Sequence, residues 1–323
     1  MRILRSLFVL VCTVLLWGAV GGPVWGQSVD LGGRVYMDYF YNVADPDPQE
    51  EGLHGFQYRR LYLTADYQLS EEFSGRARLE APEAVGGVSG VKVKDLSLTW
   101  NYSGDHTATM GVTPPPAFGL AEDVWGYRSL EKTVMDLQGI VNSRDLGLRV
   151  DGPLVGDGTV RYAAMVANNS NTAFREGDEY KRVYGQLQVR PTDRWLLVAG
   201  ADYQGRADSS GTRASLLAGY TTDAVRVGLE TYWYQSSQTG PDVTDLGASL
   251  FGVVQVAPAW ALIARLDRAT ASFGGADTDD MLLVGGVAYR PHENVTLVPN
   301  LLYRDTDRTS AATTGRFTVE INF

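Results

Sequence analysis

The final stretch of the sequence, Gly315-Arg316-Phe317-Thr318-Val319-Glu320-Ile321-Asn322-Phe323, alternates polar and apolar residues without interruption. A period of two is typical of a β-strand with one polar and one apolar face. The same period returns along the chain from Val29 onward and predicts sixteen strands. These strands span residues 29–41, 57–69, 73–81, 91–102, 106–113, 143–151, 159–168, 181–190, 194–203, 212–220, 225–234, 244–256, 260–268, 281–290, 295–304 and 315–323.

The connections between the predicted strands alternate strictly between long and short. The long ones span residues 44–53, 82–90, 114–142, 169–180, 204–211, 235–243, 269–280 and 305–314. The short ones span residues 70–72, 103–105, 152–158, 191–193, 221–224, 257–259 and 291–294. A closed antiparallel barrel with turns at one end and loops at the other has this alternation. The sequence therefore predicts an all-β fold, a 16-stranded antiparallel transmembrane β-barrel with short periplasmic turns and long extracellular loops.

Composition agrees with a folded protein that has no disulfide framework. The chain has 323 residues, of which 44% are hydrophobic, and a single cysteine. Its apolar strand rows have no helices to cover them, so lipid around a closed barrel is the solvent that suits them. Aromatic residues also cluster at the strand ends, as expected of interfacial girdles. One girdle comprises Tyr67, Phe73, Trp100, Tyr102, Trp195, Tyr220, Trp260, Tyr289 and Phe323, and the other Tyr41, Tyr203, Trp233 and Tyr303.

The first 26 residues have the pattern of a secretory signal peptide. Arg2 and Arg5 precede an apolar run from Leu7 to Leu16, and Val24-Trp25-Gly26 offers small residues for cleavage. We therefore expect residues 27–323 to form the barrel of an exported protein without cysteine. Loss of the two arginines takes the net charge from −10 to −12.

The polar strand rows face the interior, which sixteen strands make too wide for side chains to fill. The strand register places fourteen arginines there: Arg34, Arg60, Arg76, Arg78, Arg149, Arg161, Arg182, Arg190, Arg213, Arg226, Arg265, Arg290, Arg304 and Arg316. Ten acids share the wall: Asp38, Asp66, Glu80, Asp95, Asp145, Asp202, Glu230, Asp245, Asp267 and Glu320. Guanidinium forks suit phosphate and carboxylate oxygens, so the wall predicts an anion path. The alternative is that the arginines only pair with these acids across strands.

The longest connection, residues 114–142, opens with Pro114-Pro115-Pro116-Ala117-Phe118-Gly119. Loops of this length usually have a function. Ser129 could cap a short helix, whose apolar residues would pack inside the barrel. We expect an infolded constriction loop in which Arg128 and Lys132 line the narrowest passage. The alternative is a lid packed on the barrel rim.

With these features the chain resembles bacterial outer-membrane porins, and more specifically is similar to the phosphate-selective (phosphate and polyphosphate) porin family. The motifs that carry the resemblance are Phe56-Gln57-Tyr58-Arg59-Arg60-Leu61-Tyr62-Leu63, Arg76-Ala77-Arg78-Leu79-Glu80, Pro115-Pro116-Ala117-Phe118-Gly119-Leu120, Ser143-Arg144-Asp145-Leu146-Gly147 and the terminal Phe323. The resemblance implies an arginine-lined channel for small anions, a homotrimer, contact with outer-membrane lipid and lipopolysaccharide, and recognition of Phe323 by the barrel-assembly machinery. The chain departs from the family in its few lysines and its acidic loops.

Other functions keep some support in the sequence. A general or cation-preferring porin would follow if acids dominated the mouth, and a barrel with a plugged lumen would act as an anchor. An enzyme would need His54, His106 or His292, of which the first lies at the opposite end from the other two. Acidic loops, at Asp277, Asp279 and Asp280 and at Asp45, Asp47, Glu50 and Glu51, match no defined calcium loop. We predict no catalytic residues, metal site, cofactor or nucleic-acid partner.

Overall fold

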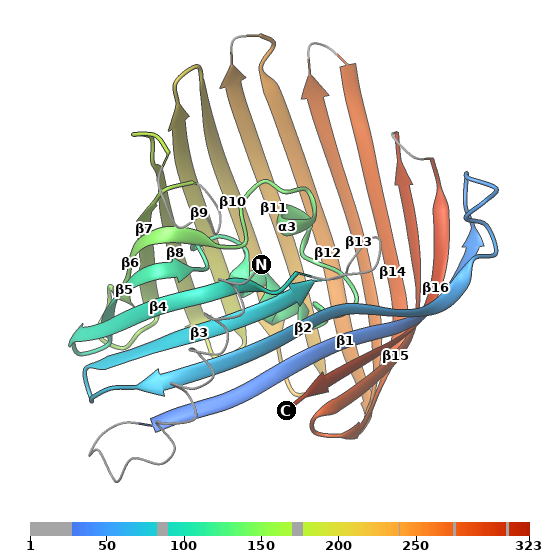
Figure 1. The fold of residues 1–323 in the computed structure, drawn as a ribbon, viewed down its shortest axis with the longest axis horizontal. Coiled ribbons are helices and arrows are strands. Elements are labelled where there is room, and N and C mark those ends of the chain that lie inside the picture. Colours follow the sequence, from blue (N-terminus) through green and yellow to red (C-terminus); the bar gives the residue numbers. More distant parts are fainter. Residues whose placement is uncertain (1–27, 83–89, 170–176, 239, 274–275, 308–309) are drawn as a thin grey trace, which may run out of the picture.

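Sixteen β-strands close into one antiparallel barrel in the computed structural model of the chain (Figure 1). Each strand pairs with its neighbours in sequence, and β1 pairs with β16 to close the sheet. The structure describes residues 28–82, 90–169, 177–238, 240–273, 276–307 and 310–323, so the predicted signal peptide lies outside the described residues. The predicted 16-stranded antiparallel barrel is confirmed.

The strands are β1 (Ser28–Ala44), β2 (His54–Gln68), β3 (Phe73–Pro82), β4 (Lys92–Ser103), β5 (His106–Thr113), β6 (Asp145–Pro153), β7 (Val160–Ala167), β8 (Arg182–Thr192), β9 (Trp195–Arg206), β10 (Ser209–Thr221), β11 (Val225–Gln238), β12 (Val243–Ala257), β13 (Trp260–Phe273), β14 (Ala276–His292), β15 (Val295–Thr306) and β16 (Ala312–Asn322). Two short helices, α2 (Gly119–Trp125) and α3 (Val134–Leu137), lie in the connection between β5 and β6. We call residues 114–144 the third loop. The end of the barrel with the short turns is the turn end, and the opposite end is the loop end.

Strands β9 to β16 extend further toward the loop end than the sequence predicted. Residues 204–211, predicted as a long connection, mostly belong to β9 and β10, which a two-residue hairpin joins. Most of residues 269–280, also predicted as a long connection, belong to β13 and β14, whose paired residues run from Trp260 opposite Tyr289 to Phe273 opposite Ala276. These strand ends consist mostly of small and polar residues, so hydrophobic alternation does not mark them as strand. Figure 1 shows this taller wall behind the lower one.

The outer surface of the barrel is apolar. Phe56 is 90% exposed, Leu31 77% and Met110 70%. In β16, Phe317 points outward and is exposed, whereas Thr318 is fully buried on the inner side. Near the turns, outward aromatic rings pack in pairs, as in Phe73 against Trp100 and Trp260 against Tyr289. An apolar exterior bounded by aromatic rings suits contact with lipid acyl chains.

Among the described residues, no helix is long and apolar enough to cross a membrane.

The third loop folds into the lumen and packs against the inner face of β9 to β15 (Figure 1). Much of this inner face is apolar, because β9, β13, β14 and β15 carry apolar residues in both rows. Buried charged residues share it, among them Arg213, Glu230, Arg265 and Asp267. The apolar part takes part in a hydrophobic cluster. The buried wall residues of this cluster are Leu196, Val198, Leu217, Phe251, Val253, Ala261, Ile263, Leu282, Val284, Ala288, Val298 and Leu302. The interior therefore has a hydrophobic core on one side, and the predicted infolding of the third loop is confirmed.

Candidate functional site

The apolar side of the third loop centres on Trp125, at the end of α2. Its indole is fully buried and meets Phe251 edge to face, with ring centroids 5.6 Å apart. The guanidinium of Arg265 lies over the same ring at 5.2 Å. Leu130 and Val124 bury their side chains in the same cluster. This half of the lumen is therefore filled with side chains in the way that a soluble protein core is.

Wall side chains also hold the third loop through its backbone. Arg59 donates to the carbonyl oxygens of Ser129, at 2.5 Å, and Leu130, at 3.3 Å. Other wall side chains donate hydrogen bonds to backbone carbonyl oxygens of the loop in the same way: Arg149 to Pro114, Gln186 to Ala117, Arg226 to Trp125, Arg182 to Ile140 and Arg316 to Leu130. A guanidinium suits this role because it has several donors in a fixed plane and stays charged. These bonds fix the loop at several points along its length.

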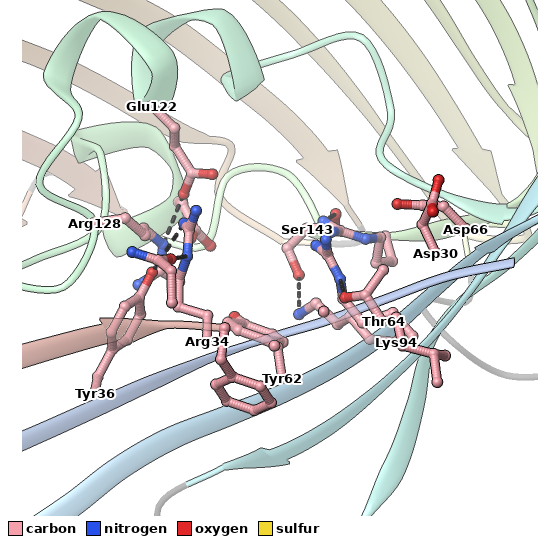
Figure 2. A pocket seen from close by; sticks show the side chains of 18 of the residues that line it. Asp30, Arg34, Tyr36, Tyr62, Thr64, Asp66, Lys94, Glu122, Arg128 and Ser143 are labelled. Carbon is pink, nitrogen blue, oxygen red and sulfur yellow. Dashed lines mark hydrogen bonds and ion pairs between the residues drawn. The ribbon is translucent and has the colours of Figure 1, made fainter. Parts of the chain in front are cut away.

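The polar side of the loop faces the wall of β1 to β4 across a cavity of about 400 Å³ (Figure 2). Five cations line the cavity: Arg34, Arg78 and Lys94 from the wall, and Arg128 and Arg144 from the loop. Four acids line it as well: Asp30, Asp66, Glu122 and Asp136. In Figure 2, Asp30 and Asp66 lie together, apart from Arg34 and Arg128. The candidate site is thus a charged cavity, which we call the passage, on the side of the lumen opposite the hydrophobic core.

Two β-bulges add charged residues to the inner wall beside the passage. In β2, Tyr36 pairs with Arg60 and Met37 with Tyr58, so Arg59 is the extra residue. In β4, Asp95 pairs with Arg78 and Val93 pairs with Leu79, so Lys94 is the extra residue. A bulge lets two consecutive side chains point to one face. Arg59 and Arg60 therefore both point inward, as do Lys94 and Asp95.

The sequence prediction missed Arg59 and Lys94 because strict alternation assigns them to the lipid face. A basic residue on that face costs about 2–4 kcal/mol near the membrane midplane. Two adjacent charged residues in a strand therefore point to a bulge at Arg59-Arg60 and at Lys94-Asp95. At Asp267-Arg268 the register continues and Arg268 lies on the outer face. The prediction also missed Arg144, which lines the passage, because it began the strand at residue 143, whereas β6 begins at Asp145 and leaves Arg144 in the third loop.

The cations of the passage are held in place by neighbouring groups. Lys94 Nζ lies 3.2 Å from Glu80 and 2.9 Å from the Ser143 hydroxyl, to which it donates. Arg78 donates to the Thr64 hydroxyl at 2.8 Å and lies 3.5 Å from Asp95, which also pairs with Arg144. Arg34 donates to Asn322 at 2.7 Å. These contacts fix where each positive charge stands, at the cost of partial neutralisation.

Within the loop, Arg128 is held between two acids. It donates to Glu122 at 2.7 Å and to Asp136 at 3.3 Å. Burial and the neighbouring Asp136 raise the pKa of Glu122, and Arg128 opposes them. Lys132, the other residue predicted at the constriction, lies 3.7 Å from Asp136 and does not line the cavity.

Lowering the pH should make the charge of the cavity lining more positive. Protonation of Glu122 removes one negative charge, and its raised pKa places this step above the pH at which a glutamate of ordinary pKa 4.5 titrates. Reversal potentials measured across a series of pH values should therefore shift toward anion selectivity in that range. Glu122→Gln should remove the step. A wild-type preference that stays constant or moves toward cations as the pH falls would contradict this assignment.

The other predicted pore-lining arginines fall into separate places. Arg182 and Arg265 are buried beneath the loop, paired with Asp202 and Asp267. Arg226 and Arg316 contact loop carbonyls. Arg76 and Arg149 line a second cavity of about 350 Å³, and Arg304 lines a third cavity of about 480 Å³. Arg60 forms an ion pair with Glu80. Arg161 lies at the start of β7, at the turn end.

The three histidines lie apart from the passage. His54 shares a hydrogen bond of 2.8 Å with Tyr39 at the loop end. His106 contacts the Tyr162 hydroxyl at 3.2 Å, and His292 accepts from the amide of Asn294, both at the turn end. In the part of the chain that the structure describes, no three His, Cys, Asp or Glu side chains gather as metal ligands would.

Comparison with known proteins finds similarity in structure only. No protein-family model matches the sequence, and no curated protein sequence matches it. An anion-selective porin from Comamonas acidovorans has a TM-score of 0.67 at 13% identity, over 92% of this chain and 100% of that chain. The outer membrane channel DcaP of Acinetobacter baumannii has a TM-score of 0.67 at 11% identity, over 93% and 99%. OmpT of Vibrio cholerae, an outer membrane protein in a trimer form, has a TM-score of 0.65 at 13% identity, over 92% and 99%. This chain therefore shares the sixteen-stranded barrel fold of these outer-membrane proteins.

Proposed function

We propose that the protein is an outer-membrane porin, a water-filled channel through which small hydrophilic solutes diffuse passively. The observation that carries the proposal is the charged cavity between the third loop and the wall of β1 to β4. Its lining of fixed cations and acids holds water and solutes rather than packing side chains. The apolar exterior and the similarity to solved porins support the location in a membrane.

We further propose that the channel prefers anions, such as phosphate. Five cations and four acids line the passage, and the basic groups are mostly arginines, whose planar forks bind oxyanions in two places at once. Closely spaced weak sites pass an ion from one to the next without trapping it. A general or cation-preferring channel is the second candidate, because Asp30, Asp66 and the acidic residues of the loop end also meet a solute.

Single-channel current in a planar bilayer tests both proposals. Under a KCl gradient, the reversal potential should have the sign of anion selectivity, and phosphate should block the current at millimolar or lower concentration. Arg78→Ala should weaken the block. Cation-selective steps would leave the porin and contradict the anion preference.

A plugged barrel that acts as an anchor is favoured by one observation, the hydrophobic packing of the third loop across half of the lumen. Conductance separates the two functions. A correctly folded barrel that passes no current would contradict the channel and support the anchor.

The remaining parts of the proposal concern assembly. Residues 1–26 serve as a cleaved signal peptide, Phe323 is read by the barrel-assembly machinery, and the barrel assembles as a homotrimer in contact with lipid and lipopolysaccharide. The trimer form of the similar outer membrane protein supports the oligomeric state. The separation of the three histidines supports a channel over an enzyme.

A further inference from the structure

Four arginines face the lumen close to the turn end. Arg161, Arg190, Arg226 and Arg290 lie within a few residues of the short turns, on β7, β8, β11 and β14. Each belongs to the row of side chains that faces the third loop. Arg226 itself donates a hydrogen bond to the Trp125 carbonyl. Arg190 lies in the same row as Gln186, which donates to the Ala117 carbonyl, and Arg290 lies in the same row as the buried Ala288. Arg161 shares its row with the buried Ala163 and Met165.

These arginines take part in no ion pair among the residues that the structure describes, in contrast to the paired arginines of β3, β6 and β13. The loop side chains that meet them are Asp123, beside Arg190, and Tyr127, whose ring centroid lies 5.9 Å from the guanidinium of Arg226. The short turns carry acids too, namely Glu71, Glu72, Asp105, Asp157, Asp193, Asp223 and Glu293. Those acids stand at the chain reversals, outside the inner wall. The inner wall at the turn end is therefore basic on the side of β7 to β14.

The loop end has the opposite charge. Its described hairpins and strand ends carry Asp45, Asp47, Glu50, Glu51, Asp178, Glu179, Asp208, Asp242, Asp277, Asp279, Asp305 and Asp307. The basic residues at this end are Lys92, Lys181 and Arg206, and Arg268 pairs with Asp279 on the outer face. Asp245 and Asp280 add acids to a cavity on the inner side of this end, where Arg304 is the basic residue. A solute entering here first meets a negative potential.

From this axial asymmetry we infer that the channel rectifies ionic current, passing more when the loop side is positive. Anions concentrate at the basic inner wall of β7 to β14 at the turn end, and cations at the acidic loop end. A positive loop side drives both populations into the passage and raises its ion content, whereas the opposite polarity drains it. The inference rests on the proposed channel function. It adds that the size of the current depends on the sign of the voltage, which anion preference alone does not imply.

The test is a current–voltage curve from single channels of known orientation in about 0.1 M KCl, where the Debye length is about 10 Å. Residues 27–323 contain no cysteine, so Asp208→Cys in the β9–β10 hairpin and an impermeant thiol reagent in one chamber identify the loop side. The current at about 100 mV should be about twofold larger with the loop side positive than with it negative, and the ratio should approach one in about 1 M KCl, where charges are screened.

Arg161→Gln, Arg190→Gln and Arg290→Gln together should reduce the rectification, and Arg226 is left intact because it holds the loop. Arg194→Gln, in a turn, is the matched control and should keep it. An ohmic curve in dilute salt, or a larger current with the loop side negative, would overturn the inference while leaving the channel. No current at all would instead overturn the proposed function. The salt dependence of the wild-type protein needs no variant and so does not depend on how the triple variant folds.

Discussion

Trp125→Ala should lower the free energy of unfolding by about 3–5 kcal/mol and widen the channel. Removal of a fully buried aromatic side chain loses its transfer free energy and leaves a cavity. Trp125 packs on Phe251 and Arg265 at the centre of the contact between loop and wall. Denaturant unfolding in detergent gives the stability, and single-channel recording should show a larger or noisier conductance as the loop loosens.

Trp233→Ala is the matched control for this substitution. Trp233 lies on β11, on the outer face of the barrel, and is 36% exposed. The same loss of side-chain volume from that face should leave the channel conductance unchanged. Equal effects of the two variants on conductance would show that the packing of the third loop does not set the width of the passage.

The second large effect is expected from reversing charge in the passage. Arg34→Glu combined with Arg78→Glu changes the charge of the cavity lining by four units, on a wall that faces the acids of the loop. The ratio of anion to cation permeability should fall by about tenfold or more, and the reversal potential should change sign. Neither arginine is buried, so the barrel should still fold.

The control for charge reversal is Arg268→Glu. Its side chain lies on the outer face of β13, is 70% exposed and pairs with Asp279. The substitution changes the charge by two units outside the lumen, half the change of the double variant, and the selectivity should stay close to that of the wild-type protein. If the double variant in the passage changed selectivity no more than Arg268→Glu, solutes would have to cross by another route.

The barrel could be predicted from the sequence because every strand presents one row of side chains to lipid. Each of these rows is apolar, so the same period of two recurs in strand after strand. Phe317, Val319 and Ile321 show this in β16, where the predicted alternation is the observed one. The sequence also predicted that the third loop folds inward, from the length of the segment and from apolar residues such as Val134 and Met135, which are fully buried.

The division of the lumen could not be predicted from a single strand period. Leu282 and Val284 face inward and the adjacent Leu283 faces outward, so β14 is apolar on both faces. The inner row is buried in a hydrophobic cluster to which the third loop contributes Trp125 and Leu130. Arg265 and Arg182 follow the predicted register, yet they lie under the loop. Register gives the direction of a side chain, whereas the position of the loop decides whether water reaches it.

The most direct test of the account asks which half of the lumen carries the current. Single cysteines are introduced into residues 27–323 at Arg78, in the passage, and at Leu282, beneath the third loop, and each variant is exposed to a negatively charged methanethiosulfonate during single-channel recording. The account predicts that Arg78→Cys is modified and its current reduced, and that Leu282→Cys is unaffected. Modification of Leu282→Cys with Arg78→Cys unaffected would contradict a passage between the third loop and the wall of β1 to β4.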